Sequence, residues 1–242
     1  MRYFVPDIRV AEEAPTCIER LSGVPWGLPK ERWPKCSQCG GHQSLIAQFQ
    51  HHADRLDLGR EGRMLFVFHC EKDPGMCDDW EPFSGGNACF VVEPENLQHG
   101  ETAIPAGGLP IEHSVRVVNW IERDDGLPAT LTDYFRNDAQ HLGLPEEVHA
   151  QVKWGSRLGG FPNWMQSAEE APQGWDFVAQ LDSSYSFYSP PAQSQPWISD
   201  DPEKFEGRTH IGKGPNFGFG LGYVLLRRRA NDVPEGCFFW QR

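Results

Sequence analysis

The sequence contains no long hydrophobic run. Residues 1–16 include no apolar stretch of signal-peptide length, and no segment reaches the roughly 20 apolar residues of a membrane-spanning helix. The seven cysteines are odd in number, which, without a secretion signal, favours a reducing compartment. We therefore predict a soluble cytoplasmic protein.

The sequence is also poor in basic residues. It has 22 lysines and arginines against 34 aspartates and glutamates, a net charge of -12. A nucleic-acid-binding protein needs basic surface to neutralise phosphates, so this composition argues against that class. An acidic surface suits a basic protein partner, although a merely solvated acidic surface would explain the same composition.

Long helical patterns are scarce, because 25 glycines and 20 prolines interrupt the chain. One segment, residues 144–153, has the pattern of a helix, with Pro145 near its start. The apolar runs are short and rich in Val, Phe and Leu, as in the core strands of a sheet. They cover residues 44–48, 64–68, 87–92, 114–121, 176–180 and 221–226. We predict a mainly β (α+β) fold with few short helices, in which a chain of this size buries roughly 70–75% of its unfolded surface.

Three of these features recur in the same order. Each half of the chain has a Gly-x-Pro turn beside a tryptophan, then a short apolar strand that ends Ala-Gln, then a second apolar strand. The turns are at residues 23–26 and 159–164, and the paired strands are 44–48 and 64–68, then 176–180 and 221–226. Chance similarity is the alternative. We predict duplicated β-rich halves packed into one body: a first repeat at 1–110, a connecting strand and helix at 111–155, and a second repeat at 156–242.

Four cysteines have the spacing of a metal site. Cys36 and Cys39 form a Cys-x-x-Cys pair, and Cys70 and Cys77 follow the apolar run 64–68. Two thiolates from a turn and two from the end of a strand can complete a tetrahedral zinc site, and four such ligands leave no open position for catalysis. The gap between Cys70 and Cys77 is longer than usual. Reduced, buried cysteines without metal are the alternative, and Cys89 is a reserve ligand. We predict structural Zn²⁺ in the first half.

No catalytic motif is convincing. The glycine-rich run 212–222 lacks the Gly-Lys-Ser/Thr of a phosphate loop, because Lys213 is followed by glycine and the run leads into a strand. It predicts a hairpin with close backbone approach. His210, Asp182 and Ser183 could be assembled into a catalytic set, but Ser183 has no Gly-x-Ser-x-Gly turn. We predict a protein that is not an enzyme, with a hydrolase acting on a modified protein or nucleotide as the alternative.

The longest segment without periodicity is residues 186–206, which we predict to be an exposed loop. Loops of this length inside a domain are often functional. We predict that an aromatic anchor lies there at the rim of an acidic groove, which would capture and occlude a basic partner. The residues are Trp197, Asp200, Asp201, Glu203 and Glu206.

Several segments together resemble a known family. The Pro-Trp at residue 26, the cysteine pair within 33–39, the run 66–70 and the Gly-Gly-Phe-Pro-Asn-Trp-Met-Gln motif at 159–166 resemble the bacterial YwqG-like family of largely uncharacterised proteins. The cysteine-bearing part also looks like the first half of eukaryotic programmed cell death protein 2. With gaps, the resemblance runs from about residue 20 to residue 226.

This resemblance implies a duplicated β-rich fold with the cysteine cluster in the first copy alone, and it implies no catalytic residues. The eukaryotic relatives are dedicated chaperones for a basic ribosomal protein, and bacterial members include suspected immunity proteins. The first turn departs from the pattern, with Ser22 where glycine is expected, so its geometry is in doubt. We predict a non-enzymatic protein that occludes a basic partner, as an immunity protein against a cognate toxin or as a chaperone.

Overall fold

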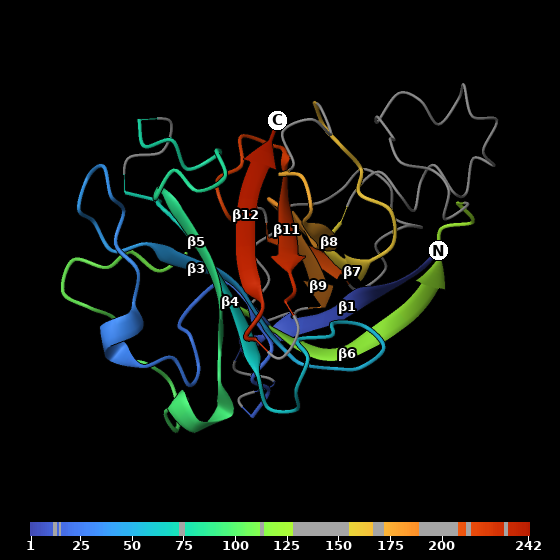
Figure 1. The fold of residues 1–242 in the computed structure, drawn as a ribbon, viewed down its shortest axis with the longest axis horizontal. Helices are drawn as coiled ribbons and strands as arrows, with labels where there is room; N and C mark the ends of the chain where they lie inside the picture. The colour runs from blue at the N-terminus through green and yellow to red at the C-terminus, as the bar shows by residue number, and fades with distance from the viewer. Residues whose placement is uncertain are drawn as a thin grey trace.

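A computed structural model describes residues 1–11, 14, 16–72, 76–111, 114–127, 155–166, 172–188, 208–211, 214–229 and 232–242. Within these residues the chain forms strands, loops and two single-turn 3-10 helices, at Lys30–Arg32 and Pro94–Asn96, so the fold is mainly β (Figure 1). None of the described helices is long and apolar enough to span a membrane. The predicted helix at 144–153 lies outside the described residues.

The strands are short and follow one another with loops between them. Their bounds are β1 (Arg2–Val10), β2 (Arg20–Leu21), β3 (Ser44–Gln50), β4 (Met64–His69), β5 (Asn87–Val92), β6 (Val115–Asp124), β7 (Arg157–Gly159), β8 (Asp176–Asp182), β9 (Tyr185–Tyr188), β10 (Arg208–Ile211), β11 (Leu221–Arg227) and β12 (Glu235–Gln241).

Ten of these strands form a closed barrel, in the order β1-β6-β2-β3-β4-β5-β12-β11-β8-β7. The ring closes because β1 pairs with both β6 and β7. The hairpin of β9 and β10 extends from β1, which β9 meets in parallel. Around the ring, β2 to β5 are neighbours in chain order, and so are β7, β8, β11 and β12. We call β1 to β5 the first series and β6, β7, β8, β11 and β12 the second series. The first strand of each series pairs with the second strand of the other: β1 with β7, and β6 with β2.

The barrel core follows the alternation of side chains along the strands, as β4 shows. On β4, Leu65 and Val67 face the interior cluster, whereas Phe66 and Phe68 belong to a second cluster outside the sheet. Loop residues, among them Trp33, cover this outer cluster. Both faces of β4 are therefore buried, which explains why the sequence has continuous apolar runs here instead of alternating polar residues.

The predicted strands are confirmed, and the errors lie elsewhere. The apolar runs correspond to β3, β4, β5, β6, β8 and β11. The long strands β1 and β12 and the short strands β2, β7, β9 and β10 were not predicted from the sequence. Residues 186–188 were predicted to lie in a loop, whereas they belong to β9 and pair with β10. β9 also pairs with β1, which is distant in the sequence, and no local pattern reveals such a pairing.

The two series of strands share a β-bulge at the same position. Between β3 and β4 the register skips Ile46, and between β8 and β11 it skips Val178. In each case the next two residues are the Ala-Gln pair that the sequence repeat contains. A bulge inserts one extra residue and bends its strand, so both series curve at the same point.

A buried arginine occupies the same position in both series. Arg20 on β2 lies opposite the glutamine of β3, and Arg157 on β7 lies opposite the glutamine of β8. Arg20 donates from Nη1 to the carbonyl of Val24 at 2.6 Å, and Arg157 donates from Nη2 to the carbonyl of Phe161 at 2.7 Å. Each arginine thus holds the turn that follows its own strand.

The two glutamines hold the same turns from the neighbouring strand. The Oε1 atom of Gln48 accepts from the backbone N–H of Trp26 at 2.8 Å, and that of Gln180 accepts from the backbone N–H of Asn163 at 3.0 Å. Both glutamines are fully buried. Buried amides need partners, so these bonds fix each glutamine and its turn together.

The first turn has the same backbone as the second despite its serine. Ser22 has a φ of +63° and Gly159 has a φ of +70°. A non-glycine residue rarely adopts this left-handed conformation. The Ser22 hydroxyl is 2.7 Å from the Tyr185 hydroxyl inside the barrel, a hydrogen bond that helps to hold the serine in place.

Candidate metal centre

The first two cysteines lie in a tight turn just before β3. The N–H of Cys36 donates to the carbonyl of Gly41 at 2.8 Å, and the N–H of Gly40 donates to the carbonyl of Cys36 at 2.9 Å. Gly40 has a φ of +68°, a conformation that glycine adopts without strain. The N–H of Gly41 also points to the Cys39 sulfur at 3.4 Å. The turn therefore directs both thiols to one side.

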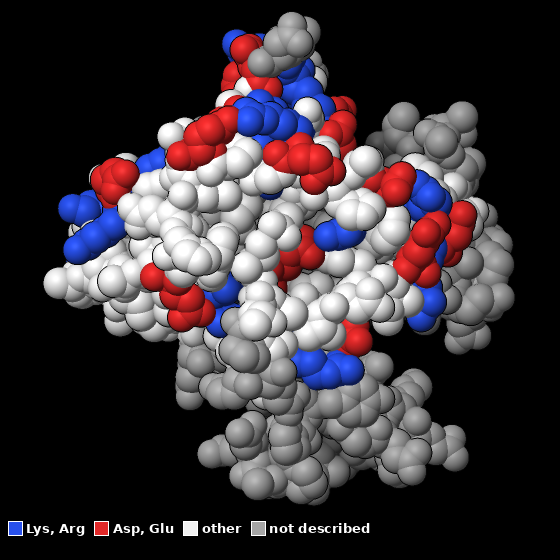
Figure 2. Space-filling view, turned by 90° about the horizontal axis from the view of Figure 1, so that it is seen from below, with Lys and Arg blue, Asp and Glu red and all other residues white. Residues whose placement is uncertain are grey.

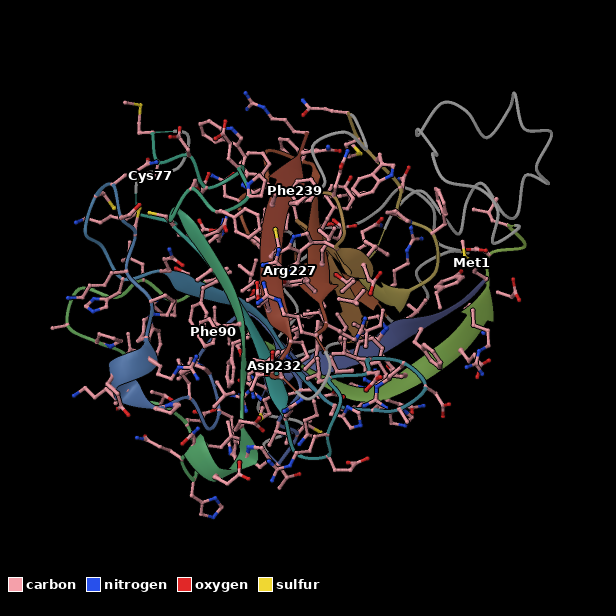
Figure 3. The ribbon with its side chains drawn as sticks, in the orientation of Figure 1. Met1, Cys77, Phe90, Arg227, Asp232 and Phe239 are labelled. Atoms are coloured by element: carbon pink, nitrogen blue, oxygen red, sulfur yellow. The ribbon has the colours of Figure 1, made fainter. Side chains whose placement is uncertain are left out.

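The other two cysteines come from β4 and the long connection to β5. Cys70 follows the last residue of β4, and its N–H donates to the carbonyl of Gly86 at 2.9 Å, just before β5. Cys77 lies farther along the same connection. Figure 3 shows Cys77 among loops at the periphery, away from β11 and β12, where Arg227 and Phe239 are labelled.

The four sulfur atoms form a compact group. All of them lie within 4.8 Å of one another, and the sulfurs of Cys39 and Cys70 are 3.6 Å apart. Ligands at the usual Zn–S distance would have sulfurs about 3.8 Å apart in a tetrahedral site. A disulfide needs about 2.05 Å, and all seven cysteines are free. The group could hold a metal ion, and its spacing fits one better than it fits a disulfide.

The surroundings of the thiols differ. Cys36, Cys70 and Cys77 are buried, whereas Cys39 is partly exposed. The Gly41 amide lowers the pKa of the Cys39 thiol. Burial raises the pKa of the Cys77 thiol. Because burial penalises an unpaired charge, a bound cation is what would let all four sulfurs ionise together.

Cys89 does not join this group. It lies on β5 opposite Val67, and its side chain packs against the barrel interior. Burial raises the pKa of its thiol well above the usual value. The structure therefore brings together the four predicted ligands and leaves the reserve ligand apart.

Polar residues beside the cysteines connect the segment between β4 and β5 to the glycine-rich turn before β11. His69 is fully buried, with its Nε2 atom 2.5 Å from Glu71 and its Nδ1 atom 3.6 Å from Asp79. Glu71 also accepts from the N–H of Asn216 in the glycine-rich turn, at 2.8 Å. Burial alone would raise the pKa of Glu71, but the hydrogen bond and charge of His69, together with the Asn216 amide, lower that pKa overall. Burial raises the pKa of Asp79 to about 6.

This polar group was not predicted from the sequence. Its only signal was the charged and polar side chains immediately flanking Cys70 and Cys77, and their convergence on one histidine depends on the folded loop. Such contacts around a ligand-bearing segment orient the ligands.

The residues considered for hydrolysis have structural partners. Asp182 accepts from the N–H groups of Gly155 and Ser184, each at 2.9 Å. These bonds hold the turns on either side of the β8 end. His210 lies on β10 opposite Ser186, and its side chain is not among those described. The catalytic arrangement therefore stays an untested alternative.

The glycine-rich run makes the predicted close approach. A Cβ atom added to Gly220 would lie 1.7 Å from the carbonyl oxygen of Gln241, and one added to Gly222 would lie 2.7 Å from the ring of Phe238. These distances exclude larger residues at both positions. The run thus packs its backbone against β12, while Lys213 lies outside the described residues.

The predicted partner-binding residues lie outside the part of the chain that the structure describes, and so their role stays a prediction. They are Trp197, Asp200, Asp201, Glu203 and Glu206.

No protein-family model matches the chain, and no curated protein is significantly similar to it.

Proposed function

We propose that this protein is a non-enzymatic binding protein that captures a basic partner protein and covers its working surface. The observation that carries the proposal is the closed group of four sulfurs, which supplies a brace between surface loops and no open coordination position. The net charge of -12 supports a basic partner. Immunity against a toxin and chaperoning of a client use the same physics, and the proposed setting is the cytoplasm.

We assign the metal as zinc. Four thiolates in a tetrahedral set suit Zn²⁺, and the turn and strand end that supply them are typical of structural zinc sites. When bound, the ion would cross-link the turn before β3 to the connection between β4 and β5. The role of this chain's own residues is then to hold the ligands, through the backbone bonds of Cys36 and Cys70.

We also propose that the two series of strands are copies of one ancestral unit. The shared bulge, the paired arginines and the paired glutamines support this proposal, since each has the same partner position in both series. The YwqG-like resemblance supports it too. Chance convergence would have to reproduce all three features at one register.

The negative charge of the protein is not concentrated on the face that Figure 2 shows. Figure 2 shows acidic and basic side chains interspersed around this face, with uncharged residues across its middle and acidic atoms in a hollow. A basic partner gains little from a surface of mixed sign. We therefore place partner contact on another part of the surface.

The test is affinity capture from the native host followed by titration calorimetry with the purified partner. We expect one basic protein at near-stoichiometric yield, bound more weakly as salt rises because the attraction is electrostatic. Failure to recover any basic protein at both low and physiological salt would contradict the proposal. A zinc analysis by mass spectrometry of the native protein checks the metal separately.

A further inference from the structure

An exposed phenylalanine is held in a strained conformation near the metal centre. Phe83 has a φ of +62° and is 62% exposed. For a bulky residue the left-handed region is an outlier, and such strain persists only where neighbouring structure imposes it. Packing does not account for it, because the ring has one described aromatic neighbour, Trp175, with ring centroids 5.3 Å apart.

The turn that carries Phe83 is fixed internally. The Ser84 hydroxyl bonds to the carbonyl of Asp78, and the N–H of Gly86 donates to the same hydroxyl at 3.1 Å. A Cβ atom added to Gly86 would lie 2.8 Å from the Asp79 backbone. The segment 78–86, which we call the Phe83 turn, is thus closed on itself with its aromatic residue outside.

The cysteine pair holds the Phe83 turn from the other side. The Ser37 N–H donates to the carbonyl of Gly85 at 3.0 Å, and the Ser37 hydroxyl donates to the carbonyl of Ser84 at 3.1 Å. Gln38 bonds to Asp78 twice, through both its amide nitrogen and its amide oxygen, at 2.8 Å each. Ser37 and Gln38 are the two residues between Cys36 and Cys39. The candidate metal centre and the presentation of Phe83 are therefore parts of one rigid unit.

The Phe83 turn is acidic. Its sequence, Asp-Asp-Trp-Glu-Pro-Phe-Ser-Gly-Gly, contains three carboxylates and no lysine or arginine. Asp79 is buried beside His69, whereas Glu81 is exposed. Across the sheet the neighbouring cation, Arg227, lies over the Trp175 ring at 4.8 Å and forms an ion pair with Glu235, so its charge is compensated.

We propose that the Phe83 turn is the contact surface for a basic segment of the partner protein, with Phe83 as the apolar anchor. The inference rests on the proposed function and names its surface. Charge complementarity selects the occupant, because Asp78 and Glu81 precede the exposed aromatic side chain and are not fully buried, and they match lysines or arginines next to an apolar residue. A rigid, pre-formed anchor loses little entropy on binding, which explains why strain is retained at this position.

A second phenylalanine provides a matched control. Phe219 has a φ of +67° and is 91% exposed. It therefore shares the residue type, the strain and the exposure of Phe83. Its neighbours in the sequence are glycines, and Arg242 lies beside Gly218, so the acidic sequence of the Phe83 turn is missing. Glu71 bonds to Asn216 in this turn, but its side chain is only 19% exposed. Loss of this side chain should leave the binding of a basic segment unchanged.

The experiment measures fluorescence anisotropy with three short labelled peptides. The first alternates lysine and arginine with leucine, the second replaces each leucine by serine, and the third replaces each basic residue by glutamate. The proteins are the native chain, Phe83→Gly and Phe219→Gly. Glycine suits both backbones, so each variant should keep its melting temperature.

We expect the first peptide to bind most tightly and Phe83→Gly to weaken it at least about tenfold, as for a hot-spot aromatic. Phe219→Gly should bind as the native chain does. Equal affinity of native protein and Phe83→Gly would overturn the inference, and so would equal binding of the acidic peptide or no binding of the first peptide. The proposed function would survive these outcomes if capture still yields a basic protein, which would then bind at another surface.

Discussion

The two series of strands are built alike, but the residue at the end of β4 and the matching residue at the end of β11 have different partners. Counting from the alanine pairs, Cys70 after β4 and Arg227 at the end of β11 occupy matching positions. Cys70 joins the four-sulfur group, whereas Arg227 forms an ion pair with Glu235 on β12. One scaffold therefore carries a four-cysteine group that could hold a metal ion in the first series and a charge pair in the second.

The lengths of the connections explain the difference. The chain runs through residues 70–86 between β4 and β5, but only through residues 228–234 between β11 and β12. A short connection is held by its strands, and an exposed ion pair adds little. A long acidic connection needs a stronger constraint to keep one conformation. The four-cysteine group therefore belongs to the loops next to β3 and β4 and not to the barrel strands themselves.

The largest test of this comparison is Cys70→Ser against Arg227→Ala. The cysteine change should abolish metal binding and lower the free energy of unfolding by about 3 kcal/mol or more, since metal binding is coupled to folding. The arginine change should cost about 1 kcal/mol or less, because its ion pair is exposed. Denaturant unfolding and metal analysis measure both. If Cys70→Ser keeps one equivalent of metal and its stability, the ligand assignment is wrong.

Chelation sharpens the same comparison without mutation. Removal of metal should increase amide hydrogen exchange in the Phe83 turn and the cysteine turn, and leave β8, β11 and β12 protected. The reason is that the barrel strands keep their ladder hydrogen bonds, while the loops lose their cross-link. Exchange measured by mass spectrometry, with and without chelator, gives the result. Uniform loss of protection would show that the barrel depends on the metal as well.

The paired glutamines give the next effect. Gln180→Ala should lower the free energy of unfolding by about 2–4 kcal/mol, because it leaves the buried side chain of Arg157 and the N–H of Asn163 without this partner. Gln48→Ala should cost less, since Gln48 makes no described bond to Arg20. Thermal and denaturant unfolding rank the two variants. The reverse order would contradict the bond between Arg157 and Gln180 as the cause of the difference.

The smallest effect concerns the turn residues. Gly159→Ser should cost about 1 kcal/mol, because serine would be forced into a left-handed backbone with its Cβ atom 3.3 Å from the carbonyl of Arg2. Ser22→Gly relieves the same strain but removes the partner of Tyr185, so its stability should change less. Equal and large losses of stability in both variants would contradict the roles that we assign to backbone strain at Gly159 and to the Tyr185 hydrogen bond at Ser22.

Much of the local structure could be predicted from the sequence. The continuous apolar run at β4 indicated a core strand of a sheet, and the clusters on its inner and outer faces confirm that. The Cys-x-x-Cys pair and the two later cysteines indicated one group, which the sulfur distances bear out. Local periodicity and ligand spacing are properties of neighbouring residues, and so they can be read along the chain.

Other features have no local signal. β1 contains Pro6 and several charged residues, so its pattern is irregular, yet it closes the barrel by pairing with both β6 and β7. The contacts of His69 with Glu71 and Asp79 form only when the loop is folded. Nothing in the sequence distinguishes Phe83 from other turn residues. Its strained, exposed conformation depends on bonds of the folded turn, such as that from the Ser84 hydroxyl to the carbonyl of Asp78.

The sequence by itself thus determined the fold class, half of the described strands and the set of cysteines, because hydrophobic period and residue chemistry act over short distances. The tertiary structure decided how the strands close into a ring and which strand of one series pairs with the other series. It also decided where the cysteine turn bonds to the acidic Phe83 turn. Those outcomes depend on pairings between residues far apart in the chain, where entropy of closure and packing, not local preference, select the partner.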